Sequence, residues 1–205
     1  MEEKNPTGLA KLGRKLVRER LDIFLPFAII AIFCPWGETE GYEHILIPVG
    51  AVLSLAGLYF RAWSMKFCGK AGASEDGVKK LTDTGPYRIC RNPLYVANIF
   101  IVTGLLVISE VLWIIPAFLV YAWVRYNSII RREEGALILQ FGEEYEEYSR
   151  RVPRWRPRLV LPFDRPRRGW GVVLQREAAE IACCAAGAVV LITKDLWLAG
   201  WIFGN

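Results

Sequence analysis

The sequence predicts an all-α fold, a polytopic membrane helix bundle of about five membrane segments that includes a tight helical hairpin. Three observations predict it. Apolar residues make up 53% of the 205 residues and are gathered in long runs. Several runs approach the roughly 20 residues that a helix needs to cross a bilayer. Basic residues flank these runs, as they do in cytoplasmic loops. The alternative is a soluble bundle with buried helices.

The first two predicted spans follow a basic N-terminal segment. Residues 1–20 place leucines at helical spacing among basic residues, which indicates an amphipathic helix on the membrane surface. Residues 21–36 lack a signal-peptide cleavage site and are expected to be retained as the first span. The second span is expected from about His44 to Trp63. The loop between the spans is acidic and the loop at 64–84 is basic, which predicts a cytoplasmic N-terminus.

A helical hairpin is expected next. Its arms are Val96–Ile108 and Val111–Val124, with a turn at Ser109-Glu110. Both arms are short, so a hairpin that stops before the far surface and two full crossings both fit the pattern. Tyr126 to Tyr148 is expected to form one amphipathic helix in or along the cytoplasm.

The C-terminal part combines an arginine-rich segment with a last apolar run. Eight arginines lie between residues 150 and 168, interrupted by prolines. Contact with anionic lipid headgroups and a purely topological positive-inside signal both explain them. The run Ala178–Phe203 is interrupted by Lys194-Asp195, so either the run ends near there or the pair faces other helices.

Charge and cysteine usage exclude several classes of protein. The net charge is +5 with a sequence pI near 9.0, but the chain contains no nucleic-acid-binding motif. Its five cysteines show neither Cys-x-x-Cys spacing nor a metal-finger pattern, so neither a disulfide framework nor a metal site is expected. The single histidine, His44, is expected at a membrane interface rather than as a ligand.

A stripe on the Tyr126–Tyr148 helix carries the first candidate residue. At steps of three and four the stripe is apolar or aromatic except for one glutamate. Its members are Ile130, Glu134, Leu137, Phe141, Tyr145 and Tyr148. A carboxylate on a buried face should be paired or should bind a cationic group. A salt bridge from Glu134 to Arg88 or Arg91 and a ligand-binding role therefore both remain open.

The second candidate region precedes the hairpin. Asn92 before Pro93 is typical of an N-cap at the start of a helix. Such a start presents free backbone N–H groups, and aromatic and cationic side chains surround this one. They are Tyr87, Arg88, Arg91 and Tyr95. A ligand with a carboxylate and an aromatic ring suits this end, and an amine on it would suit Glu133 and Glu134.

These motifs together resemble a known superfamily. The sequence contains Gly85-Pro86-Tyr87-Arg88, Arg91-Asn92-Pro93-Leu94-Tyr95, Arg132-Glu133-Glu134, Phe141-Gly142-x-x-Tyr145-x-x-Tyr148 and Val152-Pro153-Arg154. In this order and spacing they are similar to the isoprenylcysteine carboxyl methyltransferase and phospholipid N-methyltransferase superfamily. The resemblance covers about residues 84–157.

The resemblance implies an integral membrane methyltransferase that uses S-adenosylmethionine at the cytoplasmic surface and acts on a membrane lipid or hydrophobic small molecule. The implied catalytic residues are Glu134, which would position acceptor or donor, and Arg131. The implied cofactor-binding residues are Tyr87, Arg88, Arg91, Asn92, Pro93, Leu94, Tyr95, Glu133, Glu134 and Tyr148. No metal is implied. The expected organisation is a single membrane domain over residues 1–205, with its methyltransferase-like core at 84–157 and a C-terminal part at 158–205.

One departure from the family pattern bears on the chemistry. Asn92 stands where the family usually has histidine, and asparagine can form hydrogen bonds but cannot carry a proton at neutral pH. Two other functions therefore stay open. One is an NADPH-dependent membrane sterol-type reductase, whose C-terminal region is related. The other is a non-catalytic lipid-binding membrane protein.

Overall fold

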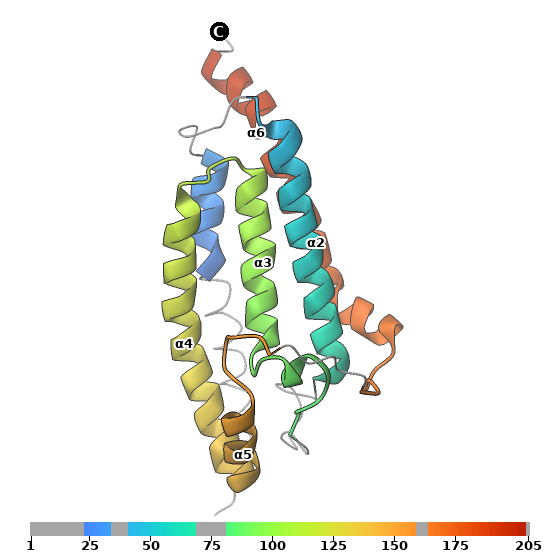
Figure 1. The fold of residues 1–205 in the computed structure, drawn as a ribbon. Helices are drawn as coiled ribbons and strands as arrows, with labels where there is room; N and C mark the ends of the chain where they lie inside the picture. The colour runs from blue at the N-terminus through green and yellow to red at the C-terminus, as the bar shows by residue number, and fades with distance from the viewer. Residues whose placement is uncertain (1–22, 34–40, 69–80, 159–163, 204–205) are drawn as a thin grey trace, which may run out of the picture.

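The structure, a computed structural model, describes residues 23–33, 41–68, 81–158 and 164–203, with side chains up to residue 194. Within these ranges the regular structure is entirely helical, which confirms the predicted all-α class. The predicted amphipathic segment at 1–20 and most of the 64–84 loop lie outside the described residues. Figure 1 shows the long helices side by side in one bundle.

The first two predicted spans are both helical where they are described. The helix Ile23–Phe33 occupies the middle of the first predicted span. Helix α2 (Glu43–Phe67) corresponds to the second and continues four residues beyond the predicted end at Trp63. The helix Ile23–Phe33 packs through Phe27 against Phe118, with ring centroids 5.3 Å apart. The N-terminal helix is therefore part of the main hydrophobic core.

The predicted hairpin is present. Helix α3 (Pro93–Ile108) is followed by a turn and then by α4 (Ile114–Phe141). At the turn Glu110 has φ +64°, a left-handed conformation that reverses the chain. Ser109 and Glu110 are both buried there. The prediction for the second arm was too short, because α4 continues well past Val124.

The expected single helix from Tyr126 to Tyr148 is wrong. Its first part belongs to α4, and a separate helix α5 (Glu143–Arg151) follows. The break is at Gly142, whose φ of +53° and ψ of −125° suit glycine and few other residues. The stripe nevertheless stays inward, because Leu137 and Phe141 pack against the buried Tyr145 and Tyr148.

Helices α2 and α3 approach each other closely through small residues. A Cβ added to Gly50 would lie 2.4 Å from the carbonyl oxygen of Gly104, and one added to Gly57 would lie 2.9 Å from that of Ala97. Ser54, between the two glycines, donates a 3.1 Å hydrogen bond from its hydroxyl to the carbonyl of Ile101. Small residues and such hydrogen bonds are what hold helices together in membranes, where lipid is as apolar as the side chains.

Helix α6 (Trp170–Phe203) begins eight residues before the predicted start at Ala178. It is tied to the other helices near both ends. Glu177 is buried and accepts a 2.5 Å hydrogen bond from Arg61 Nε of α2, whose Nη1 also donates to Asn98 of α3 at 2.7 Å. Farther along, the buried Lys194 donates a 2.8 Å hydrogen bond to the Ser109 carbonyl. Lys194 therefore faces other helices, as one of the two alternatives predicted for the Lys194-Asp195 pair requires, while the side chain of Asp195 lies outside the described residues.

Among the described residues, α2 is the one helix that is long and apolar enough to cross a membrane. Only 22% of its apolar window is buried inside the protein, unlike a core helix of a soluble bundle. Val52, Leu55 and Tyr59 are each more than 60% exposed on it. Ile23–Phe33 and α3 are apolar but shorter. A membrane association is therefore supported, and the predicted count of about five membrane segments is not confirmed.

Candidate functional site at the start of helix α3

The site lies where four helical elements meet at one end of the bundle. The short 3₁₀ helix η1 (Gly85–Arg88) leads into α3, the last turns of α4 extend past the start of α3, and α5 packs below them (Figure 1). Pro93 occupies the first turn of α3, where its missing N–H costs no hydrogen bond. The two motifs that the sequence separates by about forty residues are thus brought together.

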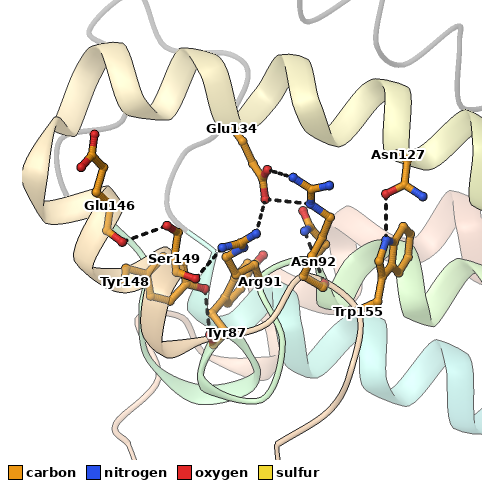
Figure 2. A network of polar contacts seen from close by, with 10 residues as sticks. Tyr87, Arg91, Asn92, Asn127, Glu134, Glu146, Tyr148, Ser149 and Trp155 are labelled. Atoms are coloured by element: carbon orange, nitrogen blue, oxygen red, sulfur yellow. Dashed lines mark hydrogen bonds and ion pairs between the residues drawn. The ribbon is translucent and has the colours of Figure 1, made fainter.

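Glu134 is at the centre of the site. Its carboxylate points from α4 towards the start of α3 (Figure 2), and the residue as a whole is 9% exposed. Arg91 Nη2 lies 3.1 Å from Oε1. Arg154 binds both carboxylate oxygens, through Nε at 3.2 Å from Oε1 and through Nη2 to Oε2. Of the two predicted readings, the structure shows the salt bridge to Arg91 and adds a second arginine that the sequence reasoning missed.

Arg91 is fixed by contacts on several sides. Besides the ion pair with Glu134, its Nη1 donates a 2.7 Å hydrogen bond to the carbonyl of Ser149 in α5. Its backbone N–H donates to the carbonyl of Pro153 at 2.9 Å. The Nε of Arg91 is buried and has no protein hydrogen-bond partner among the described residues. Because a buried donor without a partner costs free energy, this atom is a candidate contact for a polar ligand group.

A second polar pair lies beside the first. The Tyr95 hydroxyl donates a 2.8 Å hydrogen bond to Glu133 Oε1, which joins α3 to α4. Tyr95 is buried and its ring is 4.7 Å from that of Tyr126. The hydrogen bond fixes the direction of the Glu133 carboxylate, while the ring contact joins Tyr95 to the hydrophobic core.

Aromatic residues of α5 close the other side. The Tyr148 hydroxyl donates a 2.8 Å hydrogen bond to the carbonyl of Tyr87 in η1 (Figure 2). Burial, and then the negative charge of Glu134, raise the pKa of Tyr145 above its ordinary value. Burial likewise raises the pKa values of Tyr148 and Tyr87. These phenols therefore stay protonated at neutral pH and act as hydrogen-bond donors.

Residues 152–158, which we call the strap, complete the site. The strap crosses the first motif and makes backbone hydrogen bonds with it, from Arg91 N–H to Pro153 and from Arg158 N–H to Ile89, both at 2.9 Å. Trp155 Nε1 donates to Asn127 of α4 at 3.0 Å (Figure 2). The signal for Arg154 was the Val-Pro-Arg motif, but only the packing of the strap reveals that it reaches Glu134.

The remaining predicted residues differ in how they relate to this cluster. Asn92 is at the N-cap position as expected, but its side chain makes no capping hydrogen bond and approaches the Arg154 carbonyl at 3.5 Å. Arg88 is half exposed and lies 3.6 Å from Asp164, so the predicted alternative pair of Arg88 with Glu134 is wrong. Arg131 is exposed, in contrast to the buried Glu134 one turn later. Leu94 is partly buried in the first turn of α3.

The arginine-rich segment makes more intramolecular contacts than the sequence suggested. Arg168 Nη1 donates to the carbonyl of Met65 and Arg167 Nη2 donates to that of Leu81, at 3.0 and 3.2 Å. Arg154 binds Glu134. Arg156 and Arg165 have exposed side chains.

The residues at the start of α3 fit an amino-acid ligand such as the methionine end of S-adenosylmethionine. Two guanidinium groups share one carboxylate, which leaves the cluster with an excess positive charge for a ligand carboxylate. The buried Arg91 Nε is an available donor. Glu133 is one residue before Glu134 and suits hydroxyl or amine groups. Among the residues that the structure describes, no group of three or more His, Cys, Asp or Glu residues could hold a metal ion.

Two curated proteins are similar to the chain over most of its length. The cobalt-zinc-cadmium resistance protein CzcN of Cupriavidus metallidurans is 27% identical, over 94% of this chain and 90% of the relative. The nickel-cobalt-cadmium resistance protein NccN of Alcaligenes xylosoxydans xylosoxydans is 29% identical, over 71% of this chain and 68% of the relative. No solved structure has significant similarity to the chain.

A family comparison covers the part of the chain that builds most of the site. Residues 45–144 match the model of the phospholipid methyltransferase family. The matched segment runs from the start of α2 to the start of α5 and includes Arg91, Glu133 and Glu134, whereas Arg154 lies beyond it. The match confirms the resemblance inferred from the motifs: residues 45–144 are similar to the phospholipid methyltransferase family.

Proposed function

We propose that the chain is a membrane methyltransferase that transfers the methyl group of S-adenosylmethionine to a lipid or another hydrophobic acceptor. The observation that carries the proposal is the cluster of Arg91, Glu134 and Arg154 at the start of α3. Its central residues lie within the family-matched segment. The cluster is partly buried, polar and positively charged, and it lies at the N-terminal end of α3.

The chain's residues would bind the cofactor through charge and hydrogen bonding. Arg91 would hold the carboxylate with its Nε, and the N-terminal end of α3 adds a favourable field for an anion. Glu133, held by Tyr95, would accept hydrogen bonds from the amine or from ribose hydroxyls. Bound there, the cofactor supplies an electrophilic methyl group on a sulfonium. Glu134 is then a residue that orients the two arginines rather than a base.

The methyl transfer itself requires little acid–base catalysis by the protein. An in-line displacement requires the acceptor atom to be aligned with the methyl group and water to be excluded. The phenols of Tyr87, Tyr145 and Tyr148 have raised pKa values, so they do not serve as bases near neutral pH. This favours an acceptor that needs no deprotonation, such as a carboxylate, or an amine that loses its proton to solvent.

We place the site and the N-terminus on the cytoplasmic side. Lysine and arginine are concentrated around the end of the bundle where the site lies, and the loop before α2 is acidic. The exposed Arg156 and Arg165 would contact anionic headgroups at that surface. Accessibility of single cysteines introduced next to Arg156 and Gly41, probed in intact cells and in inverted vesicles, tests the orientation.

Isothermal titration calorimetry of the purified protein in detergent tests the cofactor assignment. The unaltered protein is expected to bind S-adenosylmethionine, and Glu134→Gln is expected to weaken binding strongly because it releases both arginines. Glu147→Gln, an exposed residue of α5, is the control and should bind as the unaltered protein does. If the unaltered protein binds no cofactor, the proposal is wrong. Thermal protection by NADPH instead would favour the reductase alternative.

Turnover is a separate question from binding. The protein would be incubated with lipid extract and S-adenosylmethionine carrying an isotopically labelled methyl group, and the lipids would be analysed by mass spectrometry. Labelled product that depends on Glu134 supports the enzyme. Cofactor bound without transfer to any lipid would favour the non-catalytic alternative.

A role in metal resistance is a second candidate function. The chain is similar to one protein named for cobalt, zinc and cadmium resistance and to another named for nickel, cobalt and cadmium resistance. The similarity to the first covers 94% of this chain. Under this proposal, methylation of a membrane component contributes to tolerance of these ions. A metal-sensitive host expressing the chain should survive higher cobalt or cadmium concentrations, and Glu134→Gln should abolish the gain. Equal protection by the unaltered protein and by Glu134→Gln would show that resistance does not depend on methyl transfer.

A further inference from the structure

The strap contributes to the site although it lies outside the family-matched segment, which ends at residue 144. Its backbone bonds with Ile89 and Arg91 hold it across the first motif. Trp155 anchors the strap to α4 through Asn127. The side chain between these anchors, Arg154, is therefore held at a defined place next to Glu134.

Arg154 and Arg91 bind the same carboxylate in different ways. Arg154 uses two nitrogens on two oxygens, the fork geometry that fixes both distance and plane. Arg91 uses one terminal nitrogen on Oε1 and keeps its Nε without a protein partner. Glu134 is thus held by Arg154 and in turn holds Arg91.

We propose that Arg154 is a positioning residue of the cofactor site: it fixes Glu134, which orients Arg91 towards the carboxylate of the bound cofactor. This inference rests on the function proposed above. Without Arg154 the Glu134 carboxylate, which is buried, would draw the Arg91 guanidinium into a closer pair with itself. The cluster would also lose its excess positive charge, so a ligand carboxylate would be bound less tightly.

The role of Arg154 predicts an effect on one part of the ligand only. S-adenosylhomocysteine carries the carboxylate, whereas 5′-methylthioadenosine has the same adenosine and thioether but no amino-acid group. Arg154→Met is expected to weaken S-adenosylhomocysteine on the order of 10- to 100-fold, a typical result of misplacing a binding group, and 5′-methylthioadenosine by less than about threefold. A merely structural role would weaken both ligands equally.

The matched control is Arg156→Met, two residues along the same strap with an exposed side chain. It should bind both ligands as the unaltered protein does. Arg154→Lys keeps the charge without the fork, so its loss for S-adenosylhomocysteine should be intermediate. If Arg154→Met does not fold, the selectivity of Arg154→Lys between the two ligands decides the question.

The outcomes separate the two proposals. If the unaltered protein binds S-adenosylhomocysteine and Arg154→Met binds it equally well, the role of Arg154 is overturned while the function stands. Equal losses for both ligands also overturn it. If the unaltered protein binds neither ligand, the proposed function falls and the role of Arg154 falls with it.

Discussion

Gly50 of α2 and Gly104 of α3 are in backbone contact: a Cβ on Gly104 would lie 2.5 Å from the Gly50 carbonyl oxygen. Backbone lies on both sides of this contact, so a side chain cannot be accommodated by a rotamer change. The contact sets the spacing of α2 and α3 along much of their length. It therefore helps to place the start of α3, where the site lies.

Gly50→Ala is expected to destabilise the protein, although alanine is the better helix former. Its Cβ would meet the Gly104 carbonyl at 2.4 Å, and such overpacking costs about 1–3 kcal/mol. Gly135→Ala in α4 is the control, because its Cβ would meet nothing within 4 Å and should stabilise the helix by up to about 1 kcal/mol. Thermal unfolding in detergent should show shifts of opposite sign. Equal midpoints for the two variants would contradict the close contact.

Arg61→Met is expected to be strongly destabilising. It leaves the buried Glu177 of α6 without its 2.5 Å partner, and breaking a buried ion pair costs about 3–5 kcal/mol. Arg176→Met removes the neighbouring exposed arginine of α6 and should change the unfolding midpoint little. The double change Arg61→Met with Glu177→Gln should recover part of the loss, because no buried charge then lacks a partner. A double variant less stable than Arg61→Met would be evidence against the pairing.

Tyr95→Phe tests the pair with Glu133. The phenylalanine keeps the ring contact with Tyr126 but removes the 2.8 Å hydrogen bond that orients Glu133. A net loss of about 1 kcal/mol corresponds to roughly a fivefold weaker affinity for S-adenosylmethionine. Tyr59→Phe on the exposed face of α2 is the matched control and should have no effect on binding. Unchanged affinity in Tyr95→Phe would show that the orientation of Glu133 does not contribute to cofactor binding.

Helical periodicity predicted the inward face of the site well. Glu134, Tyr145 and Tyr148 are buried and Phe141 is partly buried, as the spacing indicated. Periodicity depends only on local geometry, and one helix turn follows another whatever the surroundings. Periodicity does not show where one helix ends and the next begins, so the end of the second hairpin arm was wrongly placed at Val124. The composition of the chain changes near Val124, but the backbone hydrogen bonding of α4 continues to Phe141.

The partners of Glu134 were only half predictable. Arg91 was named because it belongs to the motif that the hairpin returns to the same end of the bundle. Arg154 was known as part of a motif but was not predicted to be a partner of Glu134. Its position next to Glu134 depends on the path of the strap across residues 89–91, which is set by tertiary packing. Asn92 shows the converse. Its place as N-cap followed from Pro93, but its side chain approaches the strap rather than the backbone of α3.

The pH dependence of stability should report the burial of Cys90. Burial raises the pKa of this thiol from 9.0 to about 11. Above about pH 9 the unfolded chain loses the proton that the folded protein still holds, so the contribution of this group to stability is complete below pH 9 and is lost as the pH rises towards 11. The loss is about 3 kcal/mol.

Cys90→Ala separates this contribution from that of the site tyrosines. The ordinary pKa of Tyr145 and Tyr148 is 10.0 and their folded values are higher, so their contributions are lost mainly above pH 10. Between about pH 9 and pH 10 the unfolding midpoint of the unaltered protein should therefore fall, while that of Cys90→Ala should fall less steeply. Cys183→Ala, an exposed thiol of α6, should keep the slope of the unaltered protein. An equally steep fall in Cys90→Ala would show that Cys90 does not carry the titration.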